Sequence, residues 1–529
     1  MLSQRALYAF AVVLTAAATP IVDLGYSQYQ GSVNTTSNIT TFLGIRYAAA
    51  PIDDLRFRGP HSPPNVAGVQ QAVVQPDQCF QGASGTSSTN PLEARAVDVG
   101  TSEDCLFLNV FYPSDGDGVP VGQLPTIVWI HGGGYTSGAA SMYPGTDLIS
   151  QSQRGVVVVA IQYRLGLFGF LPGSEVKNNG TLNAGLLDQD FALRWVNKHI
   201  SKFGGDPLKV TIWGESAGAG SVLQQVVANN GETTPQLFRG AITSSTFLPS
   251  QYHYNDRISE LLYSEVVAQT NCSLASDSLA CLRVADANAL AVVNLAISND
   301  FFFGTFAFIP VVDGEFIVQR PTVSLAEGKV NGKALLSVTN AFEGTSFVDQ
   351  TKATTANATQ YALDLFPKFG TTQADQVGAL YAGLGTPIFQ TNAVMGESIF
   401  ICPTYFLLRA FAGRSFKSEF AIPPAFHGYD VLDYFPSTRI FYPTVPVFNN
   451  PVFIDAFASS FISFAISLDP NTKVKPTITP RWNKWSVGAT EMLFNRTDAG
   501  AALVKPVETS NDLLKRCQFW ESVGDLTGQ

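Results

Sequence analysis

The sequence is short of charge. Asp, Glu, Lys and Arg make up only 14% of the 529 residues and apolar residues 46%, so the chain can build a large core and is not disordered. Basic residues are the scarcer kind, with 32 Lys and Arg against 42 acidic residues and a formal net charge of −10. Binding to nucleic acid or to an anionic membrane surface needs a basic surface, so this balance argues against both partners.

Beyond its first residues the sequence has no long apolar run. A bilayer-spanning helix needs about 20 apolar residues, and no run after residue 18 comes close, so we expect no stable membrane anchor. At the start, Arg5 precedes an apolar stretch over residues 7–18 that ends in three alanines, as in a cleaved secretory signal. We therefore predict a signal peptide over residues 1–18 and a soluble, secreted mature protein.

Cysteine is scarce as well. The six cysteines show no CxxC spacing and no His/Cys cluster, so neither a metal site nor a cofactor is indicated. In an oxidising compartment all six can pair as disulfides. Spacing alone leaves the pairing open. It favours a local Cys272–Cys281 bridge and a clasped loop between Cys79 and Cys105, which would leave Cys402 and Cys517 as the third pair.

Six N-x-Ser/Thr sequons support the same secretory route and predict N-linked glycans. They lie at Asn34, Asn38, Asn179, Asn271, Asn357 and Asn495.

The first half of the chain alternates between strand-like and helical patterns. Continuous apolar runs rich in β-branched residues predict strands that are covered on both faces, at residues 124–131 and 156–163. Apolar residues at helical spacing over 187–203, and shorter strands at 210–213, 241–245 and 334–339, continue the alternation. This pattern predicts an α/β fold with a large, mostly parallel central sheet flanked by helices. We interpret residues 250–330 and 350–425, which lack the rhythm, as insertions that cap the sheet, and residues 19–529 as one domain.

A G-x-S-x-G sequence, Gly214-Glu215-Ser216-Ala217-Gly218, follows a predicted strand and precedes a helical run. Glycines allow a sharp strand-to-helix turn that lifts the serine side chain clear of the backbone. In this context the motif predicts Ser216 as a nucleophile.

A serine nucleophile needs a base and an acid that orients the base, in the chain order Ser, acid, His. Of the five histidines only His253 and His427 follow Ser216, and His253 has the polar neighbours of a surface residue. His427 is therefore the candidate base. Glu343, which follows the predicted strand 334–339, fits the acid, although the sequence alone does not separate it from neighbouring carboxylates.

Three consecutive glycines follow the predicted strand 124–131, in His131-Gly132-Gly133-Gly134-Tyr135. Backbone N–H groups there can approach a developing alkoxide, as an oxyanion hole requires. A phosphate-binding loop is the rival interpretation, and it lacks both the G-K-[ST] ending and the GxGxxG spacing. We expect His131 to stabilise this loop rather than to act as a base.

Taken together, these motifs resemble those of the type-B carboxylesterase family, which includes cholinesterases and secreted fungal lipases and has the α/β-hydrolase fold. The resemblance spans nearly the whole mature chain. It rests on residues 42–48, 55–57, 102–110, 131–135, 203–207, 214–218, 310–314, 340–344, 400–403 and 517–520.

The resemblance implies a carboxylic ester hydrolase with Ser216 as nucleophile, Glu343 as acid and His427 as base. It further implies oxyanion donors at Gly133, Gly134 and Ala217. The disulfides that it implies are Cys79–Cys105, Cys272–Cys281 and Cys402–Cys517. It also implies a small-molecule ester as the partner.

Departures from close relatives bear on which ester is cleaved. Arg95 stands where cholinesterases place an aromatic choline platform, which argues against quaternary ammonium substrates. The loop between Cys79 and Cys105 is small and polar, unlike the apolar lid of an interfacial lipase. Gly304 and Phe306 align with positions that restrict the size of the acyl group in cholinesterases. Packing in the core would account for these two residues equally well.

These features favour soluble esters with short-to-medium acyl or aromatic groups. The alternatives are a lipase or sterol esterase acting on long-chain esters and, because some relatives lack catalysis, a binding or adhesion protein.

Overall fold

The computed structural model describes residues 19–87, 100–441 and 444–529. The predicted signal peptide, residues 1–18, and Arg95 lie outside the described residues.

An 11-stranded sheet forms the centre of the described part, in the order β16-β15-β14-β13-β12-β11-β9-β10-β8-β4-β3. The strands from β10 to β15 pair in parallel, and antiparallel strands complete both edges. The sheet consists of β3 (Ser32–Asn34), β4 (Ile39–Arg46), β8 (Phe107–Pro113), β9 (Leu124–Ile130), β10 (Val157–Ile161), β11 (Gly205–Glu215), β12 (Gly240–Ser244), β13 (Ala334–Asn340), β14 (Ser415–Phe420), β15 (Thr490–Arg496) and β16 (Ala502–Glu508). Short strands lie outside it: β1 (Ile21–Asp23), β2 (Gln28–Gln30), β5 (Val69–Gln71), β6 (Gln78–Cys79) and β7 (Thr101–Ser102). The mostly parallel sheet confirms the predicted fold class.

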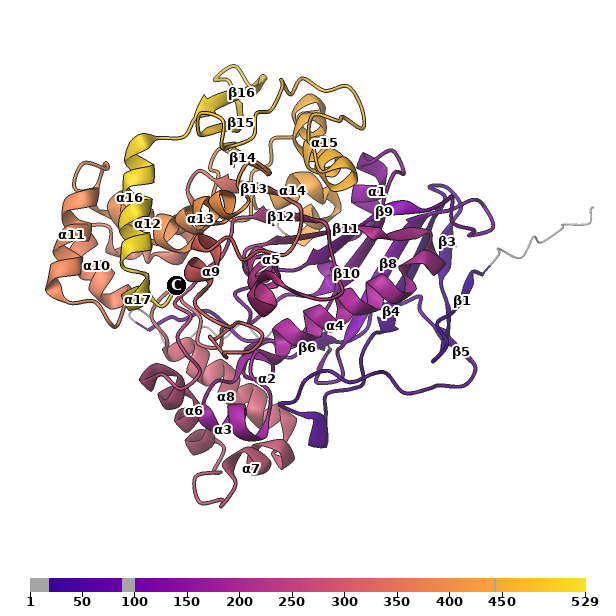
Figure 1. Cartoon of the computed structure of the whole chain (residues 1–529), viewed down its shortest axis with the longest axis horizontal. Coiled ribbons are helices and arrows are strands. Elements are labelled where there is room, and N and C mark those ends of the chain that lie inside the picture. Colours follow the sequence, from indigo (N-terminus) through magenta and orange to yellow (C-terminus); the bar gives the residue numbers. More distant parts are fainter. Residues whose placement is uncertain (1–18, 88–99, 442–443) are drawn as a thin grey trace, which may run out of the picture.

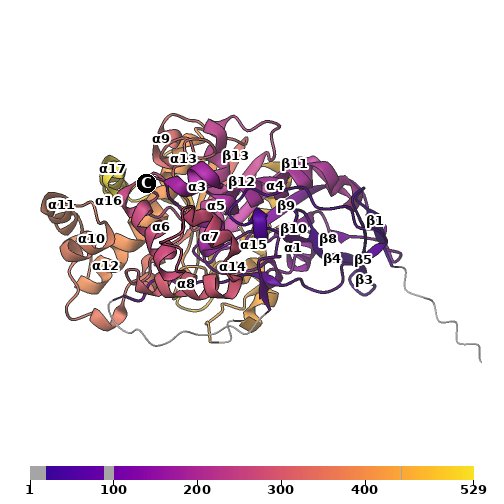
Figure 2. The same cartoon turned by 90° about the horizontal axis from the view of Figure 1, so that it is seen from below.

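Helices cover both faces of this sheet and extend beyond one end of it (Figures 1 and 2). They are α1 (Thr146–Gln151), α2 (Gly166–Phe170), α3 (Ser174–Asn179), α4 (Ala184–His199), α5 (Ala217–Val227), α6 (Arg257–Gln269), α7 (Ser278–Val284), α8 (Ala287–Asp300), α9 (Pro321–Ala326), α10 (Ala358–Leu365), α11 (Thr371–Tyr381), α12 (Pro387–Gly396), α13 (Cys402–Ala410), α14 (Val431–Tyr434), α15 (Pro451–Ser467), α16 (Asn511–Ser522) and α17 (Gly524–Thr527). A 3₁₀ turn, Glu343–Phe347, and a π-helical segment, Glu397–Ile401, matter for the site below.

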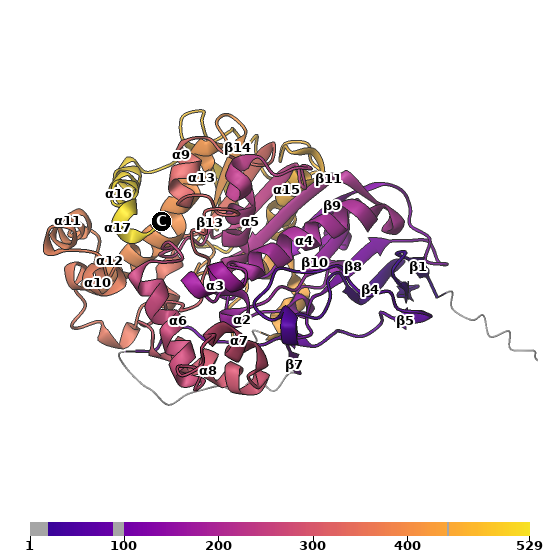
Figure 3. The same ribbon diagram turned by 60° about the horizontal axis from the view of Figure 1, so that its bottom comes forward.

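Alternation along the strands divides the core into two. In β9, Val128 and Ile130 pack with α4 and α5, whereas Ile127 and Trp129 pack with α1, α14 and α15 on the opposite face. Figure 3 shows α4 and α5 crossing the near face of the strands. Because residues on both faces of β9 and β10 are buried, the sequences of these strands are continuously apolar. These apolar runs are the pattern that predicted them.

One part of the predicted organisation is wrong. Residues 250–330 supply α6–α9, as an insertion should, but residues 350–425 supply a strand of the central sheet, β14, besides α10–α13. Its sequence, SFKSEF, has the polar alternation of a surface segment, yet Lys417 is fully buried and its Nζ lies 2.9 Å from Oε2 of Glu491. A distant carboxylate neutralises the lysine, and the local pattern does not reveal that partner.

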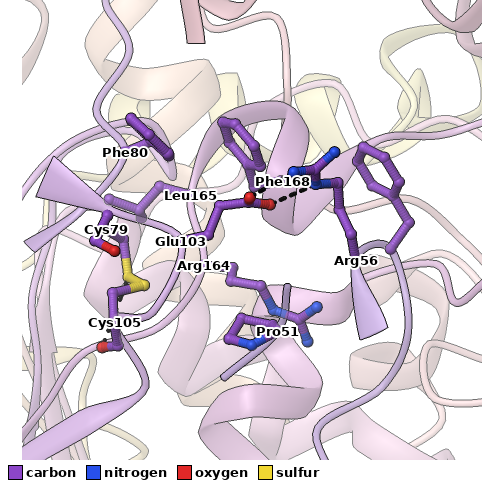
Figure 4. Close-up of a pocket in the computed structure, with 11 residues that line it drawn as sticks. Pro51, Arg56, Cys79, Phe80, Glu103, Cys105, Arg164, Leu165 and Phe168 are labelled. Carbon is purple, nitrogen blue, oxygen red and sulfur yellow. Dashed lines mark hydrogen bonds and ion pairs between the residues drawn. A yellow bond between two sulfur atoms is a disulfide. The ribbon is translucent and has the colours of Figure 1, made fainter. Parts of the chain in front are cut away.

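Three disulfide bonds close loops around this framework, and they are the three that the family resemblance implies: Cys79–Cys105, Cys272–Cys281 and Cys402–Cys517. Figure 4 shows the first beside a buried ion pair in which Nε and Nη2 of Arg56 each donate to an oxygen of Glu103 at 2.6 Å. Nη1 of Arg56 donates to the carbonyl of Leu282, at the C-terminal end of α7. The clasped loop is thereby tied to the helical insertion.

One helical stretch in the described residues, Pro387–Ala410, is long and apolar enough to cross a membrane by length and composition. Of its most apolar window, 78% is buried inside the molecule, which is the behaviour of a core helix.

The sequon asparagines lie at the surface of the described chain. Asn495 is half-buried in β15, and the other five, Asn34, Asn38, Asn179, Asn271 and Asn357, are exposed.

Candidate active site

Ser216 lies in the turn between β11 and α5. Its backbone has φ 55° and ψ −125°, a conformation that L-residues rarely adopt and that costs about 1–3 kcal/mol. The flanking glycines make the turn sterically feasible. A Cβ on Gly214 would lie 2.3 Å from the carbonyl carbon of Gly218, and one on Gly218 would lie 2.0 Å from the carbonyl oxygen of Ile130. The turn holds Ser216 at the carboxyl end of the parallel sheet, where α/β proteins bind their ligands.

Glu343 and His427 meet at the same edge. Glu343 begins the 3₁₀ turn after β13, His427 follows β14, and Oε2 of Glu343 lies 2.6 Å from Nδ1 of His427. Oε1 of Glu343 accepts hydrogen bonds from Oγ of Ser245 and from the backbone N–H of Asn340, each at 2.7 Å. The buried carboxylate is thereby fixed in position, and it faces the imidazole with one oxygen.

Two further carboxyl groups lie close to the imidazole. Oε1 of Glu215 is 3.3 Å from Nε2 of His427, and that nitrogen has no hydrogen-bond partner within the described chain. Burial raises the pKa of Glu215 to about 8 and the pKa of Asp430 to about 6. Burial alone would lower the pKa of His427, but the charge and hydrogen bond of Glu343, with smaller contributions from Glu215 and Asp430, outweigh it and leave this pKa raised.

The glycine loop after β9 lies beside Ser216. Gly133 and Gly134 have φ values of 102° and 64°, and a Cβ on either would overlap its neighbours, Ser137 O at 2.2 Å and the Phe306 ring at 2.0 Å. Ala217 is the first residue of α5 and is fully buried. The backbone N–H groups at a helix start have no partner within the helix, so they are free to bind an anion.

His131 is buried at the base of this loop. Its ring stacks on Tyr163 at 4.5 Å between centroids, and its Nδ1 lies 2.9 Å from the carbonyl oxygen of Gly132. Burial lowers its pKa to about 4, so the ring is neutral at ordinary pH. His131 therefore packs and orients the loop, whereas His253 is exposed.

Five of these residues open onto one cavity of about 340 Å³, called the catalytic cavity below. Ser216, His427, Glu215, Gly133 and Gly134 line it. Its remaining wall comes from the loop after β9, from Phe306 and Phe347, and from the segment after His427.

The two predicted acyl-pocket residues occupy different places. Phe306 lines the catalytic cavity, and Gly304 does not; Gly304 lines a second, apolar cavity of about 240 Å³ behind Phe306. Gly304 has φ 74°, and a Cβ there would lie 2.1 Å from the carbonyl oxygen of Phe347. The backbone packing itself therefore requires a glycine at 304.

Several residues around His427 were not predicted from the sequence as parts of the site: Ser245, Asn340, Phe347, Phe400 and Asp430. Asn340, Phe400 and Asp430 lie in or beside sequence motifs, but the motifs do not show that these side chains meet around His427. Ser245 and Phe347 belong to no motif, and their contacts appear only in the fold. In the described residues, no group of three or more His, Cys, Asp or Glu side chains is arranged to hold a metal ion.

Known proteins with similar sequences and structures are esterases and lipases. Residues 18–377 match the carboxylesterase family. Secreted triacylglycerol lipase LIP1 of Gibberella zeae is 31% identical over 522 residues, which cover 89% of this chain and 86% of that protein. Carboxylesterase patB of Aspergillus clavatus is 29% identical over 553 residues, covering 95% and 96%.

The crystal structure of EstA from Aspergillus niger superposes with a TM-score of 0.84 at 29% identity and covers 97% of this chain and 99% of that one. With a family match over most of the sequence and this agreement in fold, the chain belongs to the carboxylesterase family and is a carboxylic ester hydrolase.

Proposed function

We propose that this protein hydrolyses esters through an acyl-enzyme, with Ser216 as nucleophile, His427 as general base and Glu343 as the orienting acid. The observation that carries the proposal is the 2.6 Å contact between Glu343 and His427 on the cavity that Ser216 also lines. Gly133, Gly134 and Ala217 are the proposed oxyanion donors.

In the first half of the reaction, Nε2 of His427 takes the proton from Oγ of Ser216 as that oxygen attacks the ester carbonyl. The carbonyl oxygen becomes an oxyanion, which the three backbone N–H groups stabilise. His427 then gives its proton to the leaving alcohol, and the acyl group stays on Ser216. In the second half, water attacks the acyl-enzyme with the same base, and the acid product leaves.

The carboxyl groups around His427 support this chemistry. An imidazole that receives a proton in the transition state needs a nearby negative charge, which Glu343 supplies. The raised pKa of Glu215, about 8, keeps this second carboxyl largely protonated at neutral pH. Glu343 can therefore act as the principal counter-charge without a full second negative charge beside it.

For the substrate, we propose soluble esters with short-to-medium acyl or aromatic groups. The cavity of about 340 Å³ suits a small ester, and Phe306 and Phe347 place aromatic rings in its wall. A long-chain lipase or sterol esterase is the second candidate. The apolar cavity behind Phe306 and the relative named a triacylglycerol lipase favour it.

We further propose that residues 19–529 form one secreted, glycosylated domain behind a removable signal at residues 1–18. Three disulfide bonds and five exposed sequons fit an oxidising secretory route. A relative named as a secreted lipase supports the same location.

The test is hydrolysis by the purified secreted protein and its Ser216→Ala variant across soluble, emulsified and phenolic esters. We expect the variant to lose nearly all activity, with the highest wild-type kcat/KM on a soluble ester. Activity that rises sharply once substrate exceeds its solubility would favour the lipase. If the wild-type protein is inactive on every ester, the alternative of a non-catalytic binding or adhesion protein is favoured.

A further inference from the structure

A π-helical segment interrupts the long core helix that carries Cys402. α12 runs from Pro387 to Gly396, the segment Glu397–Ile401 follows with π geometry, and α13 continues from Cys402. A π turn inserts an extra residue into the helix and so changes the direction in which its side chains point; such turns often occur at functional sites. This one lies in the core beside the catalytic residues.

Phe400, within the π segment, packs on the proposed base. Its ring centroid is 4.5 Å from that of His427 and 5.1 Å from that of Phe347. Phe347 in turn lies 4.9 Å from His427. The imidazole is therefore held against two aromatic rings, one from the 3₁₀ turn that begins with Glu343 and one from the π segment.

Phe400 reaches the site only through its contacts with His427 and Phe347. It is fully buried, and it is not among the side chains that line the catalytic cavity, whereas Phe306 and Phe347 are. A substrate in the cavity would therefore touch Phe347 and His427 but not Phe400. An effect of Phe400 on catalysis passes either through the imidazole, where it changes the pH profile, or through Phe347, where it changes substrate binding.

Helix α16 fixes the π segment at both ends. At the first residue, Glu397 accepts hydrogen bonds from Nε and Nη2 of Arg516, both at 2.7 Å. Immediately after the last residue, Cys402 is disulfide-bonded to Cys517. Arg516 and Cys517 are neighbours in α16, which lies beside α12 and α13 in Figures 1 and 3.

Tyr381 adds a third interaction, which reinforces the pairing of Glu397 with Arg516. The hydroxyl of Tyr381, at the end of α11, donates to Oε2 of Glu397 at 2.7 Å and accepts from Nε1 of Trp520 at 2.8 Å. Trp520 lies one turn beyond Arg516 on the same helix. Glu397 is thus a buried carboxylate with charged and neutral donors, and such a group is costly to leave unpaired.

We propose that α16 positions the catalytic base: Arg516 and the Cys402–Cys517 bond hold the π segment so that Phe400 fixes the imidazole of His427. Phe400, Glu397 and Arg516 are positioning residues in this account. The proposal rests on the proposed role of His427 as base.

Removing the ring of Phe400 has two expected effects. The imidazole gains freedom, and a displacement of about 1 Å in a catalytic group can cost ~100-fold in rate. Water also reaches the imidazole and relieves the burial that lowers its pKa, so the pKa of His427 should rise. Glu343, Glu215 and Asp430, the titratable groups that face the ring, remain in place, so the direction of the shift reports Phe400 alone.

The experiment compares Phe400→Ala with Phe406→Ala in the full-length secreted protein. Phe406 is a buried phenylalanine on the same helix that contacts Arg409 rather than His427, so it controls for lost packing. For Phe400→Ala we expect kcat to fall about 10- to 100-fold with KM nearly unchanged, and the acidic limb of kcat/KM to move to higher pH. Phe406→Ala should lose Tm without either change. Phe400→Leu, which keeps most of the volume, serves if the alanine variant does not fold and should show the same direction with a smaller effect.

A second pair of variants tests whether α16 holds the π segment Glu397–Ile401 in place. Arg516→Ala, which breaks the ion pair with Glu397, should reproduce the kcat loss and the pH shift. Arg409→Ala is the control, because it breaks a different ion pair of α16, the one between Arg409 and Glu521 at 2.6 Å, and it should cause neither change. Arg516→Lys should rescue little, because an ammonium group does not form the paired contact of a guanidinium.

The proposal is overturned if Phe400→Ala or Phe400→Leu keeps the wild-type kcat and pH profile, or if the Phe406 and Arg409 controls shift the pH profile equally. Failure of the proposed function looks different. In that case His427→Ala, made in parallel, would retain activity whatever happens in the Phe400 variants.

Discussion

At the scale of a single residue, Ser216 has a backbone conformation that lowers the stability of the fold and places its hydroxyl in the candidate site. The side chain points into the catalytic cavity only because the backbone adopts φ 55°, and two glycines leave room for that turn. The residue is thus held in a strained conformation by its surroundings, as is common at functional sites.

This strain predicts a stability effect. Ser216→Gly and Ser216→Ala both remove the hydroxyl, but glycine adopts positive φ without penalty. We expect the glycine variant to be more stable than the alanine variant by about 1 kcal/mol. Urea unfolding of the two inactive proteins measures this difference; equal stabilities would show that the turn carries no strain.

Glu215 predicts a pH effect. Its folded pKa, about 8, lies above its unfolded value, so the protonated carboxyl favours folding at low pH and this contribution is lost as pH rises from about 5 to about 8. Glu215→Gln carries no such dependence. We therefore expect the Tm of the variant, relative to that of the wild type, to rise across this range. A constant difference in Tm would mean that Glu215 titrates normally.

At the scale of elements, the strands and turns that could be predicted are those whose sequence pattern is contiguous in the chain. β9 and β10 were predictable because burial on both faces makes their sequences continuously apolar, and the turn after β11 because G-x-S-x-G is contiguous. β14 was not, because its buried Lys417 is neutralised by Glu491, far along the chain. The packing of Phe400 on His427 likewise depends on a tertiary contact.

The loop that carries Phe306 predicts a change in specificity. Its ring separates the catalytic cavity from the second, apolar one. Phe306→Val should join the two and raise kcat/KM for longer acyl chains relative to butyrate, by roughly fourfold per methylene that enters (about 0.8 kcal/mol each).

A series of p-nitrophenyl esters measures the effect. Phe302→Val is the matched control, because Phe302 lines the second cavity but not the catalytic one. An unchanged chain-length profile in Phe306→Val would show that the second cavity does not receive the acyl chain.

For the molecule as a whole, the sequence was sufficient to predict the fold class and family, because the motifs are spread from residue 42 to residue 520. The low charge fraction matches a structure with apolar cores on both faces of one large sheet. Glu343 and His427 lie 84 residues apart in the chain, yet the sheet brings Oε2 of Glu343 to 2.6 Å from Nδ1 of His427. Sequence motifs identified both candidates, but only the fold shows their distance.

We propose Ser216 as the nucleophile of this site. Labelling the purified protein with an organophosphate serine probe, followed by mass spectrometry of its peptides, tests it most directly. We expect one adduct, on the peptide that contains Ser216, formed in proportion to the loss of esterase activity and absent from Ser216→Ala. Labelling at another serine, or full esterase activity in the labelled protein, would contradict it.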